Sequence, residues 1–475
     1  MSLEKKHLDY VESESTDSFV KIKELIKSDT SGACWHKDEV YRSLDESEEK
    51  ERLKSRDQKL KEPLSGLFCG VKDLFCVKGM TTTAGSKILE NFKSPYDSTV
   101  WESLKSKGVI LSSKCSMDEF AMGSFSNTSF LGRTSIPFKE DYSAGGSSGG
   151  SAASILAGLS DFSIGSDTGG SVRQPASFCS LVGYKPSYGA FSRFGMIAYA
   201  SSLDQAGFFT KSIADLQYIL KSDIAQQDKR DMTCVGLGDY RESESKLTKI
   251  GYFKEILENQ GISDSVKKAY QDTLLKLKEE GVQLIPVEID FMDKAAEIYY
   301  IIACSEASSN LSRYQGVYFG KKLTDEPIYE SYSDTIAHYR SKYFGIEVQR
   351  RIMLGSFILS AENFTAMYQK ACLMREALKR SMFEALSRVD CLVLPVSPTV
   401  APKWSDIEDM TPAQIYMADF MTVPFSLTGV PAISMPLCKD ENDMGIGIQF
   451  VGQKFKDYEL ISFLSHIEKT IGLKV

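Results

Sequence analysis

Two glycine-rich segments and one lysine offer the residue types that could do chemistry in this sequence. The first segment, YSAGGSSGGSAASILAGL, spans residues 142–159, and the second, DFSIGSDTGGSVRQPA, spans residues 161–176. Both combine serine hydroxyls with glycines, which let the backbone approach a bound molecule closely. Lys72 ends the apolar run in LFCGVKDLF, beside Asp73. A lysine buried there would have a lowered pKa and could act as a base, whereas a solvated strand-end lysine would only carry charge.

Three interpretations of these segments follow from the residues. A phosphate-binding loop also places glycines before a helix, but neither G-K-[ST] nor G-x-G-x-x-G is present here. A nucleophile elbow matches GSSGG at 146–150, with Ser148 at its centre, but needs a preceding strand and a later histidine. KEDYSAGG does not look like a strand, and His338 and His466 stand in charged or amphipathic helical contexts. In the third interpretation Lys72 activates a serine without any histidine.

Lys72, the loop GGSSGG at 145–150 and the run GSDTGGSVRQPA at 165–176 together resemble the amidase signature family. That family uses a triad of a lysine, a serine with a cis peptide bond and a nucleophilic serine. The resemblance implies that Lys72 is the base, Ser147 the bridging serine and Ser171 the nucleophile. The expected reaction is hydrolysis of an amide through a covalent acyl-serine intermediate.

The other polar residues of the two segments receive supporting roles from the same resemblance. Backbone N–H groups pointing at a developing oxyanion contribute about 3 to 4 kcal/mol each to catalysis. In this sequence those groups would belong to Thr168, Gly169, Gly170 and Ser171. We expect Asp167 and Arg173 to hold the loops in place, and Ser148, Ser151 and Ser154 to pack or cap.

The signature region covers Pro63 to Asp215, and stretches within and after it resemble the A subunits of tRNA amidotransferases over nearly the whole length from about residue 63. Examples are MDEFAMGS, SSLDQAG, RRIMLG and MADFMTVPFSLTGVPAIS. These glutaminases serve glutamyl-tRNA(Gln) or aspartyl-tRNA(Asn). They deliver ammonia to a B subunit, which uses ATP and Mg²⁺ and engages the mischarged tRNA, and a small C subunit joins the complex. The resemblance therefore implies B-type and C-type partners, and no cofactor in this chain itself.

Glutamine specificity requires a carboxylate for the α-ammonium group and a cation for the α-carboxylate. By the resemblance, Asp419 takes the ammonium group, Arg351 takes the carboxylate, and Tyr299 lines the pocket. Each residue also has a purely structural interpretation, as a helix cap, a surface arginine and a core aromatic residue. Ala144 departs from the family, which commonly has proline before GGSSGG.

Two other functional hypotheses stay open beside the glutaminase. The chain could be a free-standing amidase with the same signature that acts on another small amide. It could also be a degenerate scaffold subunit, although the intact Lys72, Ser147 and Ser171 argue against that hypothesis.

Composition narrows the function further. The net charge of −8 and pI near 5.4 argue against broad nucleic-acid binding and fit a subunit that leaves tRNA to its partner. The acidic N-terminus lacks a secretion or transit signal, and no run of about 18 apolar residues predicts a membrane span. The 10 cysteines contain no C-x-x-C pair and several stand in apolar runs, so we expect buried, reduced thiols in a cytoplasmic protein and no metal site.

Alternating apolar runs, glycine-rich loops and helical patterns predict an α/β fold, and the resemblance implies an α/β/α sandwich around a mixed β-sheet. We expect a charged helical N-terminal arm over residues 1–62 and one large domain over 63–475, with a helical region at about 294–389. Within these parts we predict helices at 19–26, 151–159 and 263–280 and a terminal helix from Tyr458. We predict strands at 162–166, 282–289, 390–399, 429–437 and 444–452.

Overall fold

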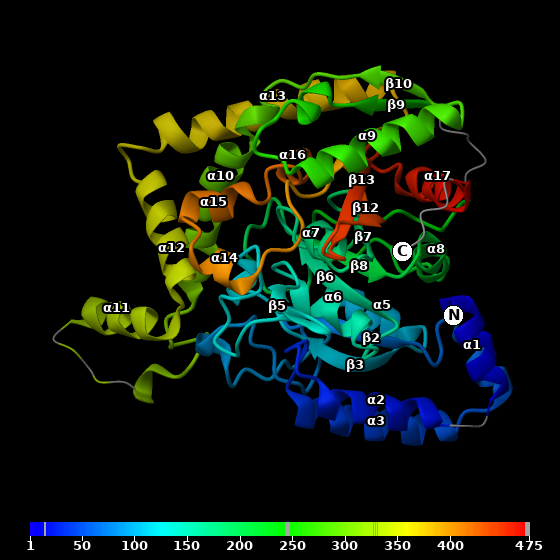
Figure 1. The fold of residues 1–475 in the computed structure, drawn as a ribbon. Coiled ribbons are helices and arrows are strands. Elements are labelled where there is room, and N and C mark those ends of the chain that lie inside the picture. Colours follow the sequence, from blue (N-terminus) through cyan, green and yellow to red (C-terminus); the bar gives the residue numbers. More distant parts are fainter. Residues whose placement is uncertain (14–15, 243–247, 326, 328, 330, 471–475) are drawn as a thin grey trace.

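The computed structural model describes residues 1–13, 16–242, 248–325, 327, 329 and 331–470. Its centre is a large β-sheet (Figure 1). The sheet has 11 strands in the order β1-β3-β2-β6-β8-β7-β12-β13-β11-β9-β10. In that order, the strands are Cys34–Trp35, Ile110–Cys115, Phe68–Lys72, Phe162–Asp167, Gln205–Thr210, Val182–Lys185, Ala432–Lys439, Gly445–Val451, Cys391–Pro395, Lys249–Tyr252 and Gln283–Pro286.

The sheet is mixed, and its directions decide which loops meet. Strand β2 runs parallel to both β3 and β6. At the far end, β9 runs parallel to β11 and β10. The pairs between β6 and β11 in the strand order, through β8, β7, β12 and β13, are antiparallel. Because β2 and β6 are parallel neighbours, the loops that follow them leave the same edge of the sheet.

Helices pack against this sheet, which confirms the predicted α/β class. Helix α6 packs on β2, β3 and β6, and its sequence GGSAASIL brings small residues close to the strands. Helix α7 packs on β7, β12 and β13. The helices of this part of the chain, with the terminal one, are α5 (Thr99–Ser106), α6 (Gly149–Leu156), α7 (Arg173–Phe178), α8 (Ile213–Leu220), α9 (Asp264–Glu279) and α17 (Asp457–Thr470).

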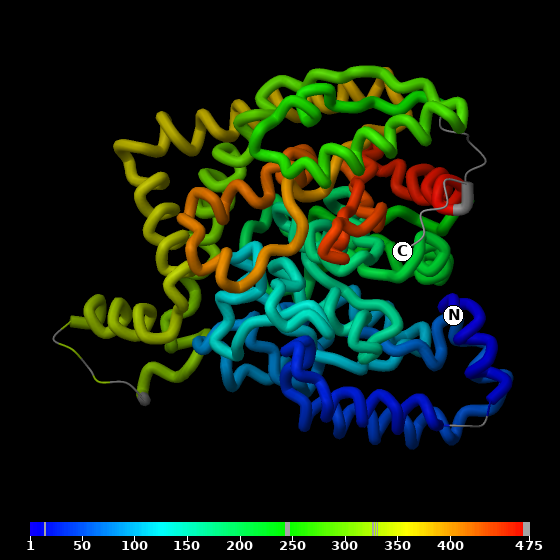
Figure 2. Tube along the Cα trace, in the orientation of Figure 1, coloured from blue at the N-terminus to red at the C-terminus, as the bar shows by residue number. Residues whose placement is uncertain are grey.

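A group of helices lies beside the sheet on the side away from the N-terminus (Figure 2). Helix α10 packs against α12, α13 and α16, and so joins this group to the loops that follow the central strands. Its members and their neighbours are α10 (Ala295–Asn310), α11 (Tyr332–Tyr343), α12 (Ile346–Ile358), a π-helical turn (Thr365–Gln369), α13 (Lys370–Arg388), α14 (Trp404–Glu408), α15 (Pro412–Met417) and α16 (Val423–Thr428).

The first residues of the chain form α1 (Leu3–Glu12), α2 (Asp17–Ser28), α3 (Lys37–Arg52) and α4 (Arg56–Lys61). The predicted amphipathic helix is α2, which buries Phe19, Ile22 and Ile26. The Phe19 ring meets the Phe68 ring of β2 edge to face, with 5.2 Å between centroids. Residues 1–62 thus pack on the sheet through an apolar contact, while their treatment as a separate unit stays a prediction.

One local prediction was wrong. The sequence KEDYS, which looked unlike a strand, forms β5 (Lys139–Ser143) and pairs with β4 (Ser135–Ile136) in a two-stranded ribbon. Four of its five residues are at least partly exposed, and Tyr142 bridges to Lys403 outside the ribbon. Strand propensity is weak for such polar residues, so tertiary pairing rather than local preference sets this strand.

All 10 cysteines are free thiols, and eight of them are buried. Cys372 is partly buried and Cys438 is exposed, so the expectation of buried thiols is wrong for Cys438. Separately, none of the helices in the described ranges combines the length and the apolar character needed to cross a membrane.

The contact between α2 and β2 predicts that removing the Phe19 side chain strongly destabilises the protein. Phe19→Ala should lower the free energy of unfolding by about 3 to 5 kcal/mol, because it leaves a cavity against Phe68. Urea denaturation measures this change. Val20→Ala, at the neighbouring position that is 51% exposed, serves as the control and should change stability by less than about 0.5 kcal/mol. Equal effects of both substitutions would contradict packing of α2 on the sheet.

Candidate active site

Strand β2 delivers Lys72 to the edge of the sheet where β6 also ends. The side chain of Lys72 is 0% exposed. Its Nζ lies 2.8 Å from Ser147 Oγ, 2.7 Å from Ser148 Oγ and 2.8 Å from Ser166 Oγ. The lysine of the proposed triad is therefore buried among hydroxyl groups, and the alternative of a solvated strand-end lysine is wrong.

Burial gives Lys72 unusual acid–base properties. Desolvation lowers its pKa from the ordinary lysine value to about 7, and the negative charges of Asp118, Asp167 and Asp204 oppose this shift. None of these carboxylates makes a direct ion pair with the amine, because its three near neighbours are neutral hydroxyls. Near neutral pH a large share of Lys72 is therefore unprotonated and able to accept a proton.

The loop before α6 holds Ser147 in a tightly packed backbone. The Gly146–Ser147 peptide bond is cis. Gly146 N donates to the Gln174 side chain at 2.9 Å, and the Ser147 carbonyl accepts from Asp118 N at 3.2 Å. A Cβ at Gly150 would lie 2.3 Å from Ser116 Oγ, so the loop approaches its neighbours too closely for a side chain there.

Ser148 and Ser166 belong to the site, although the sequence interpretation gave Ser148 only a packing role and did not select Ser166. Ser148 Oγ accepts a hydrogen bond from Lys72 and donates one to the Ser166 carbonyl at 3.1 Å. Ser148 is fully buried, and its preceding strand β5 lies outside the main sheet. The nucleophile-elbow interpretation of Ser148 is therefore wrong, because an elbow exposes its serine at the end of a central strand.

Ser171 lies on the loop between β6 and α7. Its side chain is 8% exposed, and its hydroxyl makes no hydrogen bond to any residue that the structure describes. The loop is fixed from below by the buried ion pair between Asp167 and Arg173, at 2.9 Å. Asp167 also accepts from the backbone N–H of Val172 at 3.2 Å. These contacts agree with the supporting role expected for Asp167 and Arg173.

The same loop carries several backbone N–H groups that lack a hydrogen-bond acceptor in the described structure. Over the described residues, no protein acceptor receives the N–H groups of Thr168, Gly169, Gly170 and Ser171. Buried N–H groups are almost always paired in native structures, so four consecutive free donors indicate a place for a bound oxygen. Gly170 has φ +152°, and a Cβ there would lie 2.2 Å from Thr422 Oγ1. The loop therefore has unpaired backbone N–H groups but no room for a side chain at position 170.

The three residues expected to bind glutamine lie around this loop. Tyr299 packs against Gly169, where a Cβ would be 2.8 Å from the Tyr299 hydroxyl. The hydroxyl of Tyr299 lies within the electrostatic influence of both Arg351 and Asp419, and burial raises its pKa well above the ordinary value. Tyr299, Arg351 and Asp419 are all nearly fully buried. The surface interpretation of Arg351 is therefore wrong.

Asp419 carries an unpaired oxygen. Its Oδ2 accepts from Ser124 Oγ at 2.8 Å, whereas its Oδ1 is buried and has no hydrogen-bond partner. Burial raises the pKa of Asp419 to about 7, and the charge of Arg351 opposes the shift. An orphaned carboxylate oxygen in a buried site is suited to a cationic ligand group.

Arg351 is oriented by residues that the sequence interpretation missed. Its Nε donates to Glu347 Oε1 at 2.8 Å, and its Nη1 donates to the Tyr199 hydroxyl at 2.8 Å. The rings of Tyr199, Tyr300 and Tyr416 lie 5.6, 5.3 and 5.5 Å from its guanidinium carbon. Glu347 stands four residues before Arg351 on α12, a helical pairing that the sequence spacing could have indicated.

The fold and this site together define an amidase. The family model described as amidase matches residues 14–461, and the chain belongs to this family.

Relatives narrow the comparison to one kind of amidase. The chain is 42% identical to the A subunit of glutamyl-tRNA(Gln) amidotransferase from Acinetobacter baumannii (strain AB0057), over 86% of this chain and 82% of that protein. It is 41% identical to the corresponding protein of Prochlorococcus marinus (strain MIT 9211), over 91% and 90% of the two chains. The solved structure of the A subunit from Thermotoga maritima matches with a TM-score of 0.71 and 36% identity, covering 86% of this chain and 83% of that one. A structure described as amidase matches with a TM-score of 0.79 and 26% identity, covering 99% of both chains.

The lowered pKa of Lys72 predicts a pH-dependent stability difference between the wild type and Lys72→Met. Between about 7 and the ordinary lysine value of 10.5, the unfolded chain holds a proton on Lys72 that the folded chain lacks. Raising the pH through this window should therefore stabilise the wild type relative to the variant, by at most about 1.4 kcal/mol per pH unit. Urea denaturation of both proteins at about pH 7.5 and 9.5 measures the change. Lys185, whose pKa is also lowered to about 7, is present in both proteins and cancels. A difference that does not vary with pH would show that Lys72 is protonated in the folded protein.

Proposed function

We propose that this chain is the glutaminase subunit of a glutamyl-tRNA(Gln) amidotransferase. Its substrate would be glutamine, and its product ammonia would be used to convert mischarged glutamyl-tRNA(Gln) to glutaminyl-tRNA(Gln). The observation that carries this function is the pairing of a buried amine base, Lys72, with an amino-acid pocket that holds Arg351 and an unpaired Asp419 oxygen. The names of its relatives, which the chain matches over most of their length, support the assignment.

The catalytic roles follow from a count of protons around Lys72. A neutral amine has two N–H groups and one lone pair. The Ser148 hydroxyl donates its proton to the Ser166 carbonyl, so its oxygen accepts a hydrogen bond from an N–H group of Lys72. The lone pair is then available to Ser147 or Ser166, and in the proposed mechanism it faces Ser147.

Acylation begins when Ser147 accepts the proton of Ser171 and passes its own to Lys72. Ser171 Oγ forms a bond to the side-chain carbonyl carbon of glutamine, and the carbonyl oxygen becomes an oxyanion. The free N–H groups of residues 168–171 stabilise this charge. Lys72 returns the proton through Ser147 to the nitrogen, the C–N bond breaks, and ammonia leaves.

Deacylation uses water in place of the serine. Water attacks the γ-glutamyl ester while the same relay removes its proton, and the bond to Ser171 Oγ breaks as that oxygen regains a proton. Glutamate leaves and the enzyme is restored. These steps need acid–base groups and hydrogen-bond donors, which the residues of the site supply.

The glutamine pocket would recognise the backbone end of the substrate. Asp419 Oδ1 would accept hydrogen bonds from the α-ammonium group, and the Arg351 guanidinium would bind the α-carboxylate. Tyr299 would form the wall between this pocket and the loop at Gly169.

The amidotransferase would require further subunits. A B-type subunit would receive ammonia, use ATP and Mg²⁺ and bind most of the tRNA, and a C-type subunit would complete the complex. Co-purification of this chain with a B-type subunit, and glutaminase activity that rises when that partner and glutamyl-tRNA are added, test the assignment. The same assay with aspartyl-tRNA(Asn) determines which mischarged tRNA is served.

A free-standing amidase is the second candidate. It is favoured by the structural match to an amidase over 99% of both chains, against 86% of this chain for the solved amidotransferase structure. Turnover of aliphatic or aryl amides by the isolated chain, with no turnover of glutamine, would support this candidate and contradict the glutaminase.

Removing the base or the nucleophile should separate two activities of the assembled complex. Ser171→Ala and Lys72→Ala should each lower the glutamine-dependent reaction by about 10³-fold or more, because each removes a reacting group. Both variants should keep the wild-type rate with added ammonium chloride, which bypasses the glutaminase site. Ser154→Ala, which changes a buried serine bonded to the Ser151 carbonyl, is the matched control and should keep glutamine use. Loss of the ammonia-dependent reaction would indicate broken assembly.

The contact between Glu347 and Arg351 should affect binding of glutamine more than chemistry. Glu347→Gln should raise KM for glutamine by about tenfold with a smaller change in kcat, because it weakens the charge-assisted hydrogen bond that orients Arg351. Steady-state kinetics measures the two constants separately. Glu376→Gln, at an exposed position paired with Lys379, is the control and should leave both constants unchanged. A fall in kcat with an unaltered KM would contradict a role for Arg351 in binding the substrate.

A further inference from the structure

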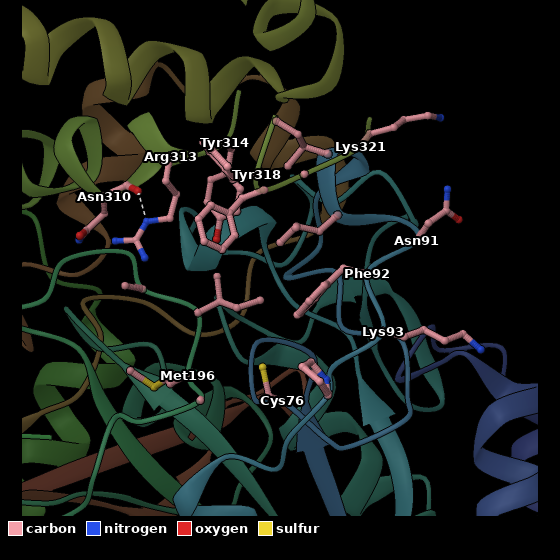
Figure 3. Close-up of a pocket in the computed structure, with 18 of the residues that line it drawn as sticks. Cys76, Asn91, Phe92, Lys93, Met196, Asn310, Arg313, Tyr314, Tyr318 and Lys321 are labelled. Carbon is pink, nitrogen blue, oxygen red and sulfur yellow. Dashed lines mark hydrogen bonds between the residues drawn. The ribbon is translucent and has the colours of Figure 1, made fainter. Parts of the chain in front are cut away.

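A cavity of about 660 Å³ lies outside the catalytic centre (Figure 3). Its walls come from residues 88–96, 195–198 and 310–322, together with Cys76, and none of Lys72, Ser147 and Ser171 lines it. Figure 3 shows Arg313, Tyr314 and Tyr318 on one side and Phe92 on the other, with Met196 and Cys76 below. A volume of this size suits a small organic molecule.

The cavity is positively charged although the whole chain is acidic. Its lining contains Lys93, Arg313, Lys321 and Lys322 but no Asp or Glu. Glu39 pairs with Lys93 at 3.1 Å, and Glu90 pairs with Lys321. In the part of the chain that the structure describes, Arg313 and Lys322 form no salt bridge. Two uncompensated cations at one cavity favour an anionic ligand.

The guanidinium group of Arg313 lines the cavity and is oriented by a backbone contact. Its Nε donates to the Asn310 carbonyl at 2.8 Å, which fixes the plane of the guanidinium group and leaves its other N–H groups without a described acceptor (Figure 3). Guanidinium groups presented in this way bind phosphate oxygens through paired hydrogen bonds.

The other walls of the cavity offer flat apolar surfaces. Five aromatic residues line it, namely Phe92, Tyr96, Tyr314, Tyr318 and Phe319. Tyr318 is 83% exposed and Phe319 is 55% exposed, so their rings have free faces. Free aromatic faces beside cations are the features on which proteins stack nucleobases, at about 1 to 3 kcal/mol per base. A simple inorganic anion would leave these rings unused.

We propose that this cavity binds one nucleotide, with its base stacked on the aromatic residues at Tyr318 and Phe92 and its phosphate bound by Arg313 and Lys322. The nucleotide is either a free nucleoside phosphate or an unstacked nucleotide of an RNA, since both present the same base and phosphate.

Two hydrogen bonds connect the wall of the cavity to Arg351 of the proposed glutamine pocket. Asn310 lines the cavity, and its Nδ2 donates to the Tyr199 carbonyl at 3.1 Å. The Tyr199 hydroxyl accepts the hydrogen bond from Arg351 at 2.8 Å. A ligand that orders Asn310 and the segment ending at Ala198 therefore acts on the group that orients Arg351. This coupling, unlike nucleotide binding itself, rests on the proposed glutaminase function.

Calorimetric titration of the full chain with AMP, adenosine, inorganic phosphate and a short single-stranded RNA tests the proposal. AMP should bind with a Kd between about 10 µM and 1 mM, and both adenosine and phosphate should bind at least about tenfold more weakly. Arg313→Ala with Lys322→Ala should weaken AMP binding by about tenfold or more. Arg380→Ala with Lys268→Ala, which removes two exposed cations of other helices, is the matched control and should leave it unchanged.

Tyr318 tests the stacking part of the proposal without disturbing the core. Tyr318→Ala should weaken AMP binding by about fivefold or more, while Tyr318→Phe should retain it. Tighter binding of the RNA than of AMP would identify RNA as the source of the nucleotide, and the reverse would identify a free nucleotide. Absence of binding of both ligands, or equal binding by the wild type and the Arg313 and Lys322 double variant, would overturn the proposal.

If nucleotide binding is found, glutaminase assays with and without AMP test the coupling. A change in KM for glutamine that disappears in the double variant supports the contact through Tyr199, and an unchanged KM overturns it. Failure of the proposed function is distinguishable, because the titration does not depend on any reaction of glutamine.

Discussion

The side-chain nitrogen of Lys72 has three neutral hydroxyl groups as its nearest neighbours. The chemistry proposed for the site depends on these neutral neighbours, because they allow the amine to lose its proton. A carboxylate in the place of one hydroxyl would hold the lysine protonated, because an opposite charge nearby favours the charged form. Asp118, Asp167 and Asp204 influence the amine from further away and oppose the effect of burial without cancelling it. The pKa of about 7 thus results from placing the amine deep in the fold while each nearby carboxylate is occupied by other donors.

Sheet topology brings the two segments of the candidate active site together. Strands β2 and β6 are parallel neighbours, so the end of β2 at Lys72 and the loop at 168–171 lie at one edge of the sheet. Along the chain, α5, β3, the β4–β5 ribbon and α6 come between these two strands, and the loop before α6 supplies Ser147 and Ser148. The free N–H groups on one loop and the hydroxyl groups around Lys72 therefore come from one contiguous unit of the chain, which runs from β2 to α7.

The sequence predicted this unit because its signals are local. Glycine-rich loops, the apolar runs before Lys72 and at 162–166, and the small-residue helix at 151–159 all appear within about 100 residues, and the observed strand and helix lie within a few residues of those bounds. Ser166 and Glu347 were missed for different reasons. The contact of Ser166 with Lys72 depends on which strands pair, which no local pattern specifies. The burial of Glu347 as an acceptor for Arg351 and Tyr416 depends on how α12 and α15 pack together, which the sequence of either helix alone does not specify.

The charges of the proposed glutamine pocket influence which amide substrate the site would accept. Glu347 already balances Arg351, and the pKa of Asp419 is raised to about 7 while its Oδ1 lacks a partner. An amide without an α-ammonium group would leave this oxygen buried and unpaired. An amide without a carboxylate would leave some N–H groups of Arg351 without an anionic partner. Sites built to pair a substrate's polar groups reject analogues lacking them by about 10⁴-fold or more, far beyond what an apolar pocket achieves. The unpaired Asp419 oxygen therefore favours an α-amino acid amide over simple aliphatic or aryl amides, which is a physical reason to propose glutamine as the substrate.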